Sequence, residues 1–159
     1  MRTSTWIGGL VGGAVVCAMV LLGGSDDRDE EAIAVGIQAM AAAVERGDRE
    51  AFWAHLAPDF HPVGRHIRHY RPDMIVDRVF QIPARMDPVE IVLENLSVEV
   101  SDDGASAKVR FKVKLVGEGM LWSVTREQMD RNRVQLKMRR YGDDWRVLEA
   151  SLAWSVMPF

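Results

Sequence analysis

Cysteine is nearly absent from this 159-residue chain, and its one thiol, Cys17, lies in an apolar N-terminal stretch. The rest of the chain therefore has no disulfide, no cysteine-based zinc site and no thiol nucleophile. Six prolines and 13 glycines are too few for a disordered or low-complexity chain. The formal net charge is −3, so no overall positive charge favours nucleic-acid binding. With 48% hydrophobic residues, the chain can form one domain with a core.

Charged side chains are missing from residues 3–25. A helix of this length spans about 34 Å, and the hydrocarbon core of a bilayer is about 30 Å thick. Arg2 precedes the run and the acidic stretch "DDRDEE" follows it. Positive charge favours the cytoplasmic side of a membrane, so this pattern predicts a cytoplasmic N-terminus. We therefore predict that residues 1–25 are a membrane anchor, or a signal peptide cleaved near Ser25. In either case, residues 26–159 form a domain outside the cytoplasm.

Glycines in the apolar run repeat at a spacing of four, as Gly8 with Gly12 and Gly9 with Gly13. Small residues at this spacing let two membrane helices approach closely. The anchor is therefore a candidate contact between two copies of the chain, although glycine is also common in membrane helices for other reasons.

Helical periodicity dominates the first half of the exported part. The stretch "DEEAIAVGIQAMAAAVERGD" places apolar side chains on one helical face, namely Ile33, Ile37, Met40, Ala41 and Val44. Gly47 ends this helix, and Asp48 caps a second, short helix over residues 49–56 that stops at Pro58. A third helix begins at Pro72.

After Pro88 the apolar period changes from 3.6 to 2. The pattern predicts five strands, over residues 89–100, 105–116, 120–125, 133–140 and 145–154. The phase slips at Glu94 and Asn95, which indicates a bulge. The second strand directs Lys108, Arg110, Lys112 and Lys114 to one side, and we interpret this basic row as a solvated face rather than a binding stripe. Helices followed by strands predict an α+β domain with the helices packed on one face of the sheet.

Three segments together resemble the nuclear transport factor 2-like superfamily, which includes ketosteroid isomerases and SnoaL-like cyclases. They are "AAAVERGDREAFWAHLAPDF", "AKVRFKVKLV" and "RRYGDDWRVLEASL". The resemblance implies a strongly curved antiparallel sheet wrapped around a long N-terminal helix, forming a cone whose mouth often holds a ligand. It implies little about activity, because this fold hosts isomerases, dehydratases, binding modules and assembly scaffolds.

The segment "DFHPVGRHIRHYRPD", residues 59–73, gathers three of the four histidines with three arginines. The arginines would repel a metal ion, and Gly64 and Pro72 disfavour the helix that would align His66 with His69. We expect no metal and no cofactor here. Arginine forks suit anions, so we expect the segment to form the rim of a pocket for a small anionic or apolar ligand. The candidate rim residues are His61, Arg65, His66, His69, Tyr70 and Trp122.

Both functional groups of the isomerases are missing from the expected places. Where the family has a base aspartate before Pro-Val-Gly, this chain has His61, and its first helix has no tyrosine. We therefore favour a non-enzymatic module for protein interaction or self-assembly, dimerising through the sheet face and the anchor. Two alternatives remain open. One is an exported protein that binds a small molecule or lipid in the cone, and the other is an isomerase or dehydratase with His61 or Asp59 as base.

Overall fold

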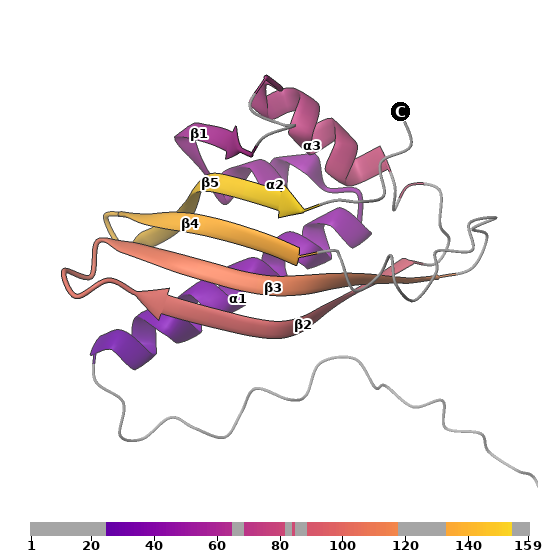
Figure 1. The fold of residues 1–159 in the computed structure, drawn as a ribbon. Coiled ribbons are helices and arrows are strands. Elements are labelled where there is room, and N and C mark those ends of the chain that lie inside the picture. Colours follow the sequence, from indigo (N-terminus) through magenta and orange to yellow (C-terminus); the bar gives the residue numbers. More distant parts are fainter. Residues whose placement is uncertain (1–24, 65–68, 82–83, 85–88, 118–132, 154–159) are drawn as a thin grey trace, which may run out of the picture.

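The computed structural model describes residues 25–64, 69–81, 84, 89–117 and 133–153 (Figure 1). Within these ranges, no helix combines the length and apolar character needed to cross a membrane. The predicted anchor or signal segment and the strand expected over 120–125 lie outside the described residues.

Three helices form as the sequence predicts, with one shorter than expected. They are α1 (Ser25–Glu45), α2 (Arg49–Ala54) and α3 (Pro72–Gln81). Between α1 and α2 the chain reverses at Gly47, whose φ of 70° suits glycine. The Asp48 side chain then accepts a hydrogen bond from the backbone N–H of Ala51 at 3.0 Å, and so caps α2.

Five strands form one sheet in the order β1-β5-β4-β3-β2. Their bounds are β1 (Leu56–Val63), β2 (Val89–Val100), β3 (Ser106–Gly117), β4 (Arg133–Tyr141) and β5 (Asp144–Ala153). The neighbours β2 to β5 pair antiparallel, but β1 pairs parallel to β5. The expected all-antiparallel, strongly curved sheet is therefore wrong: the sheet is mixed, and it does not curl into a tight cone (Figure 1).

Strand β1 was not expected, because its sequence contains two prolines, Pro58 and Pro62. Proline lacks the N–H that a central strand needs, so prolines argue against a strand when the sequence is read alone. In the fold, β1 lies at an edge of the sheet, where one side of the strand needs no hydrogen bonds. Because β1 begins at Leu56, the preceding helix ends earlier than predicted.

The predicted bulge in β2 is confirmed. Its register against β3 shifts between Glu94 and Ser97, and Asn95 has a positive φ of 55°. Asparagine tolerates this conformation better than most residues. The shift in the alternation of apolar residues therefore reflects one extra residue in β2 relative to β3.

The core lies between the helices and one face of the sheet, which we call the inner face. In Figure 1, α1 passes behind the strands and covers this face. On β3, Ala107, Val109 and Phe111 are buried, as the alternation predicts. Phe52 of α2 and Phe80 of α3 pack edge to face with their ring centroids 5.5 Å apart. Every buried side chain in the described part of the chain is apolar.

Candidate functional site on the outer face of the sheet

The opposite side of the sheet, which we call the outer face, carries the charged side chains. Strand alternation decides this placement. On β4, Leu136 and Met138 are buried in the core, so Lys137 between them points outward. Residues paired directly across antiparallel strands share a face, so Lys108 of β3 and Glu149 of β5, which both pair with Lys137, are also on the outer face.

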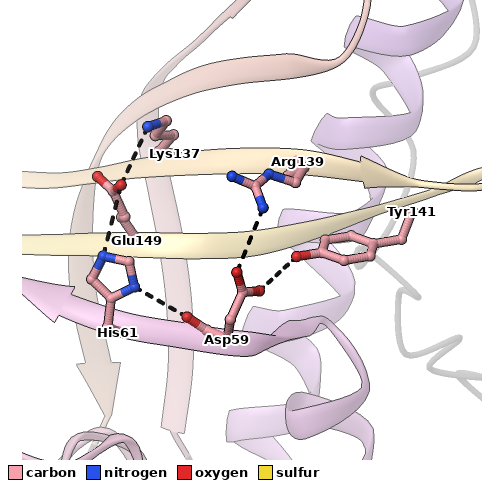
Figure 2. Close-up of polar contacts among 6 residues, drawn as sticks. All are labelled: Asp59, His61, Lys137, Arg139, Tyr141 and Glu149. Atoms are coloured by element: carbon pink, nitrogen blue, oxygen red, sulfur yellow. Dashed lines mark hydrogen bonds and ion pairs between the residues drawn. The ribbon is translucent and has the colours of Figure 1, made fainter.

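Strand β1 adds Asp59 to this face, while Phe60 beside it is buried. The Tyr141 hydroxyl of β4 donates a hydrogen bond to the Asp59 carboxylate at 2.6 Å, and Arg139 lies 3.5 Å from the other carboxylate oxygen (Figure 2). The tyrosine hydrogen bond and the arginine charge lower the pKa of Asp59. The same hydrogen bond raises the pKa of Tyr141. The contact therefore keeps Asp59 ionised and Tyr141 protonated.

His61 lies two residues further along β1 and is half exposed, with 54% of its side chain accessible. Its Nδ1 is 3.1 Å from the backbone oxygen of Asp59, and its Nε2 is 3.8 Å from the Glu149 carboxylate. Lys137 donates to the same carboxylate oxygen of Glu149 at 3.2 Å. Figure 2 shows that these contacts and the Asp59 contacts span β1, β5 and β4.

The chemistry of this network is that of surface ion pairing. A carboxylate that abstracts a proton from carbon works best when an apolar site raises its pKa toward neutrality. Asp59 has the opposite environment, since it is exposed and its pKa is lowered. Asp59 and His61 also point away from the space between α1 and the sheet, where the resemblance would place a substrate.

The six predicted rim residues fall in three places. His61 lies on the outer face of the sheet, as described above. His69, which is exposed, and Tyr70, which is half-buried, belong to the turn before α3. Arg65, His66 and Trp122 lie outside the described residues. No group of three histidine, cysteine or acidic side chains suited to a metal ion occurs in the ranges that the structure covers.

A basic band runs along the two neighbouring strands β3 and β4, and it includes the outward basic row that the sequence predicts on β3. Its members are the outward-pointing basic residues Lys108, Arg110, Lys112, Lys114, Arg133, Lys137 and Arg139. Register places Lys108 directly opposite Lys137, and Lys112 directly opposite Arg133. The alternation of basic and apolar residues within β3 and within β4 is visible in the sequence. The sequence does not show that the two basic rows lie side by side, because the residues between the strands do not fix the register in which β3 pairs with β4.

Acidic side chains border the basic band on both sides. On β2, Glu94 and Glu99 pair across from Lys112 and Lys108. On the other side lie Glu149 of β5 and Asp59 of β1. The outer face therefore has a positive centre with acidic side chains on both sides, although Arg146 of β5, opposite Arg139, adds a positive charge on the β5 side.

A second polar cluster joins α1 to the turn between β4 and β5. Arg140 pairs with Asp29 of α1, and the Arg140 guanidinium stacks 5.0 Å above the Trp145 ring. The Trp145 Nε1 also lies 3.4 Å from the Asp29 carboxylate. The Asp29 side chain is only 14% exposed, although that of Arg140 is 38% exposed. This cluster is therefore a partly buried contact between α1 and the sheet rather than an open site.

Comparisons with known proteins give the fold and no more. No protein-family model matches the chain, and no curated protein matches it. A candidate dehydratase of the nuclear transport factor 2-like family from Streptomyces avermitilis is similar in structure, with 18% sequence identity and a TM-score of 0.55; the match covers 79% of this chain and 95% of that one.

Two further solved structures match in the same way. A candidate aromatic ring hydroxylase from Novosphingobium aromaticivorans has 21% identity and a TM-score of 0.58, over 83% of this chain and 92% of that one. An uncharacterised protein with a cystatin-like fold from Caulobacter vibrioides has 20% identity and a TM-score of 0.58, over 82% and 92%. The chain thus has a nuclear transport factor 2-like, cystatin-like fold, and fold does not specify function.

Proposed function

We propose that this domain is a non-enzymatic interaction module that binds a protein partner through the outer face of its sheet. The residues before α1 would hold it outside the cytoplasm as an anchor, or direct its secretion. One observation carries the proposal. The helices bury the inner face, whereas the outer face presents an ordered array of charges, with a basic band between two acidic borders.

The placement of Asp59 and His61 supports binding rather than catalysis. They are the two residues that a catalytic interpretation would use as base. Both lie exposed on an edge strand and make ion-pair and hydrogen-bond contacts with neighbouring strands. Such contacts shape a surface and hold β1 in place, and exposed ion pairs of this kind can exchange for contacts with a partner at low cost.

A dehydratase- or isomerase-type enzyme is the second candidate, since two structurally similar proteins are described as candidate dehydratases. That function needs an ionisable group in the space between α1 and the sheet. Among the residues that the structure places, Asp29 is a mostly buried carboxylate on this side, and Arg140 already holds it in an ion pair. The arrangement therefore favours the interaction module.

Site-specific photocrosslinking in the cells that make the protein would test the proposal. A photoreactive amino acid replaces Gln135, which is exposed in the middle of the outer face, or Gln38, which is exposed on α1. We expect a discrete protein adduct from position 135 and none from position 38. An adduct of twice the chain's mass would identify the partner as a second copy.

The comparison of the two positions decides the outcome. Equal adducts from both positions would indicate random collision, and adducts from position 38 alone would place the interface on the helices. Either result would overturn the proposal.

A further inference from the structure

Resting on the proposed function, we infer that the basic band binds an extended acidic segment of the partner protein, lying along β3 and β4 on the outer face of the sheet. The partner is identified here by its chemistry, as a stretch in which aspartate or glutamate recurs at alternate positions. Four features of the outer face support this choice.

Like charges face each other twice within the band. Lys108 is directly opposite Lys137, and Lys112 is directly opposite Arg133. Direct like-charge pairs across antiparallel strands are destabilising. The fold tolerates both pairs because the inner face fixes the register. A carboxylate placed between the members of each pair would replace this repulsion by two attractions.

The spacing of the band matches an extended chain. Outward residues on β3 follow each other every second position, which is about 6.6 Å. The two like-charge pairs are four residues apart along β3, or about 13 Å. An extended peptide has the same repeat, so acidic side chains at alternate positions would meet successive basic side chains.

The acidic borders restrict the shape of the ligand. The band is two strands wide, about 5 Å between backbones, and Glu99, Glu94, Glu149 and Asp59 flank it. A flat anionic lipid surface or a nucleic-acid duplex would bring negative charge against these borders as well. A single narrow segment meets the band alone. A second copy stacked face to face about a two-fold axis through the band would set lysines against lysines.

The band also retains positive charge that the borders do not neutralise. Arg110 pairs with Glu99 at 2.7 Å, Lys137 with Glu149, and Arg139 with Asp59. Lys108, Lys114 and Arg133 make no ion pair with any residue for which the structure gives a placement. Within the described ranges, these three charges have no ion pair that an anionic partner would need to displace.

The test uses the full-length chain in nonionic detergent and a fluorescent peptide of about nine residues in which glutamate alternates with serine. Fluorescence anisotropy measures its binding at about 50 mM and about 200 mM salt. We expect binding to weaken at least tenfold, about 1.4 kcal/mol, in the double variant Lys108→Gln with Lys112→Gln. The control variant, Arg46→Gln with Arg71→Gln, removes the same charge from the turn after α1 and the turn before α3. We expect less than about a twofold change in this variant.

Two further measurements make the result specific. The band variant should unfold at about the same denaturant concentration as the parent, because the repulsion it removes on the β4 side is offset by the attraction to Glu99 and Glu94 that it removes on the β2 side. Lost binding then cannot reflect lost folding. The same peptide with glutamine in place of glutamate should not bind. Binding that persists in the band variant, or weakens equally in the control, would overturn the inference.

Other ligands give distinguishable outcomes. Vesicles containing phosphatidylglycerol that bind through the band more tightly than the peptide would show that the surface is for a membrane, and would overturn the acidic-segment inference. A crosslinked partner at position 135 without peptide binding would also overturn this inference while leaving the proposed function standing. If position 135 gives no crosslinked partner and the peptide does not bind, both the proposed function and the acidic-segment inference would be overturned.

Discussion

The two faces of the sheet are built from alternating residues of the same strands, yet they have opposite chemistry. On β4, Val134, Leu136 and Met138 are buried against the helices, whereas Arg133 and Lys137 between them are exposed. The inner face therefore supplies the free energy of folding through apolar burial. The outer face contributes little to stability, since exposed ion pairs contribute about 0 to 1 kcal/mol each.

This division has a consequence for how charge is arranged. Because packing on the inner face fixes the register, the outer face can carry repulsive pairs such as Lys108 with Lys137. The proposed function would use this freedom, since stability and function compete at binding surfaces. Substitutions on the two faces should separate these two roles.

The largest effect should come from truncating the inner face. Phe111 is 9% exposed and Trp145 is 8% exposed. Phe111→Ala or Trp145→Ala removes a large buried ring and leaves a cavity, so we expect each to lower the free energy of unfolding by about 3 to 5 kcal/mol. Urea denaturation followed by circular dichroism would measure it. A loss below about 1 kcal/mol in either variant would mean that the assigned faces of the strand are reversed.

Two adjacent arginines on β4 offer a matched comparison of the faces. Arg140 points inward to Asp29, and Arg139 points outward to Asp59. Arg140→Ala leaves a mostly buried carboxylate without its partner, so we expect a loss of about 1 to 2 kcal/mol. Arg139→Ala should cost less than about 0.5 kcal/mol. Equal losses of unfolding free energy in the two variants, measured by the same denaturation assay, would contradict the distinction between the partly buried Arg140–Asp29 pair and the exposed Arg139–Asp59 pair.

The pH dependence of stability near neutrality should come from His55, which lies outside the histidine-rich segment. His55 follows α2 and is half-buried, and this burial lowers its pKa despite the opposing effect of Asp144. The unfolded chain then binds more protons than the fold, so stability is complete above the unfolded pKa of about 6.5 and falls as pH decreases through it. We expect His55→Gln to flatten this slope in denaturation measured between pH 7.5 and 5.5, roughly the range in which histidine titrates.

The contact between Asp59 and Tyr141 predicts weaker pH effects at the extremes. The raised pKa of Tyr141 stabilises the fold below the unfolded pKa of about 10, and this contribution is lost as pH rises further. The lowered pKa of Asp59 acts in the other direction, with a contribution lost as pH falls through about 3.9 and below. Tyr141→Phe should remove the loss of stability that Tyr141 causes at alkaline pH, and should reduce the loss of stability that Asp59 causes at acid pH. An unchanged alkaline slope in that variant would show that the hydroxyl contact does not persist in solution.

The smallest effect should come from Lys112, which is the outward neighbour of Phe111 on β3. Lys112→Ala keeps the strand and its register, so we expect a stability change below about 0.5 kcal/mol. Thermal unfolding of Lys112→Ala beside Phe111→Ala compares the two faces within one residue of the chain. Similar unfolding midpoints for the two variants would contradict the assignment of both faces.

Much of the fold could be predicted from the sequence, because periodicity reports burial directly. The helical spacing of Ile33, Ile37 and Met40 and the alternation through Ala107, Val109 and Phe111 both identified buried faces correctly. The β2 bulge was also visible, as a slip in phase at Asn95. Strand β1 could not be predicted in this way, because Pro58 and Pro62 are unfavourable in most strands. They are tolerated here because β1 is an edge strand that forms its ladder hydrogen bonds on one side only.

The candidate site divides in the same way. The sequence by itself determined the order of the three helices and of the strands β2 to β5, the apolar face of each of these elements, and the outward basic row on β3, because each depends on side-chain period within one segment. Only the tertiary structure decided that β1 runs parallel to β5, that Asp59 meets Tyr141, and that Lys108 faces Lys137. Those contacts depend on strand order and register, which packing between distant segments sets and no local pattern encodes.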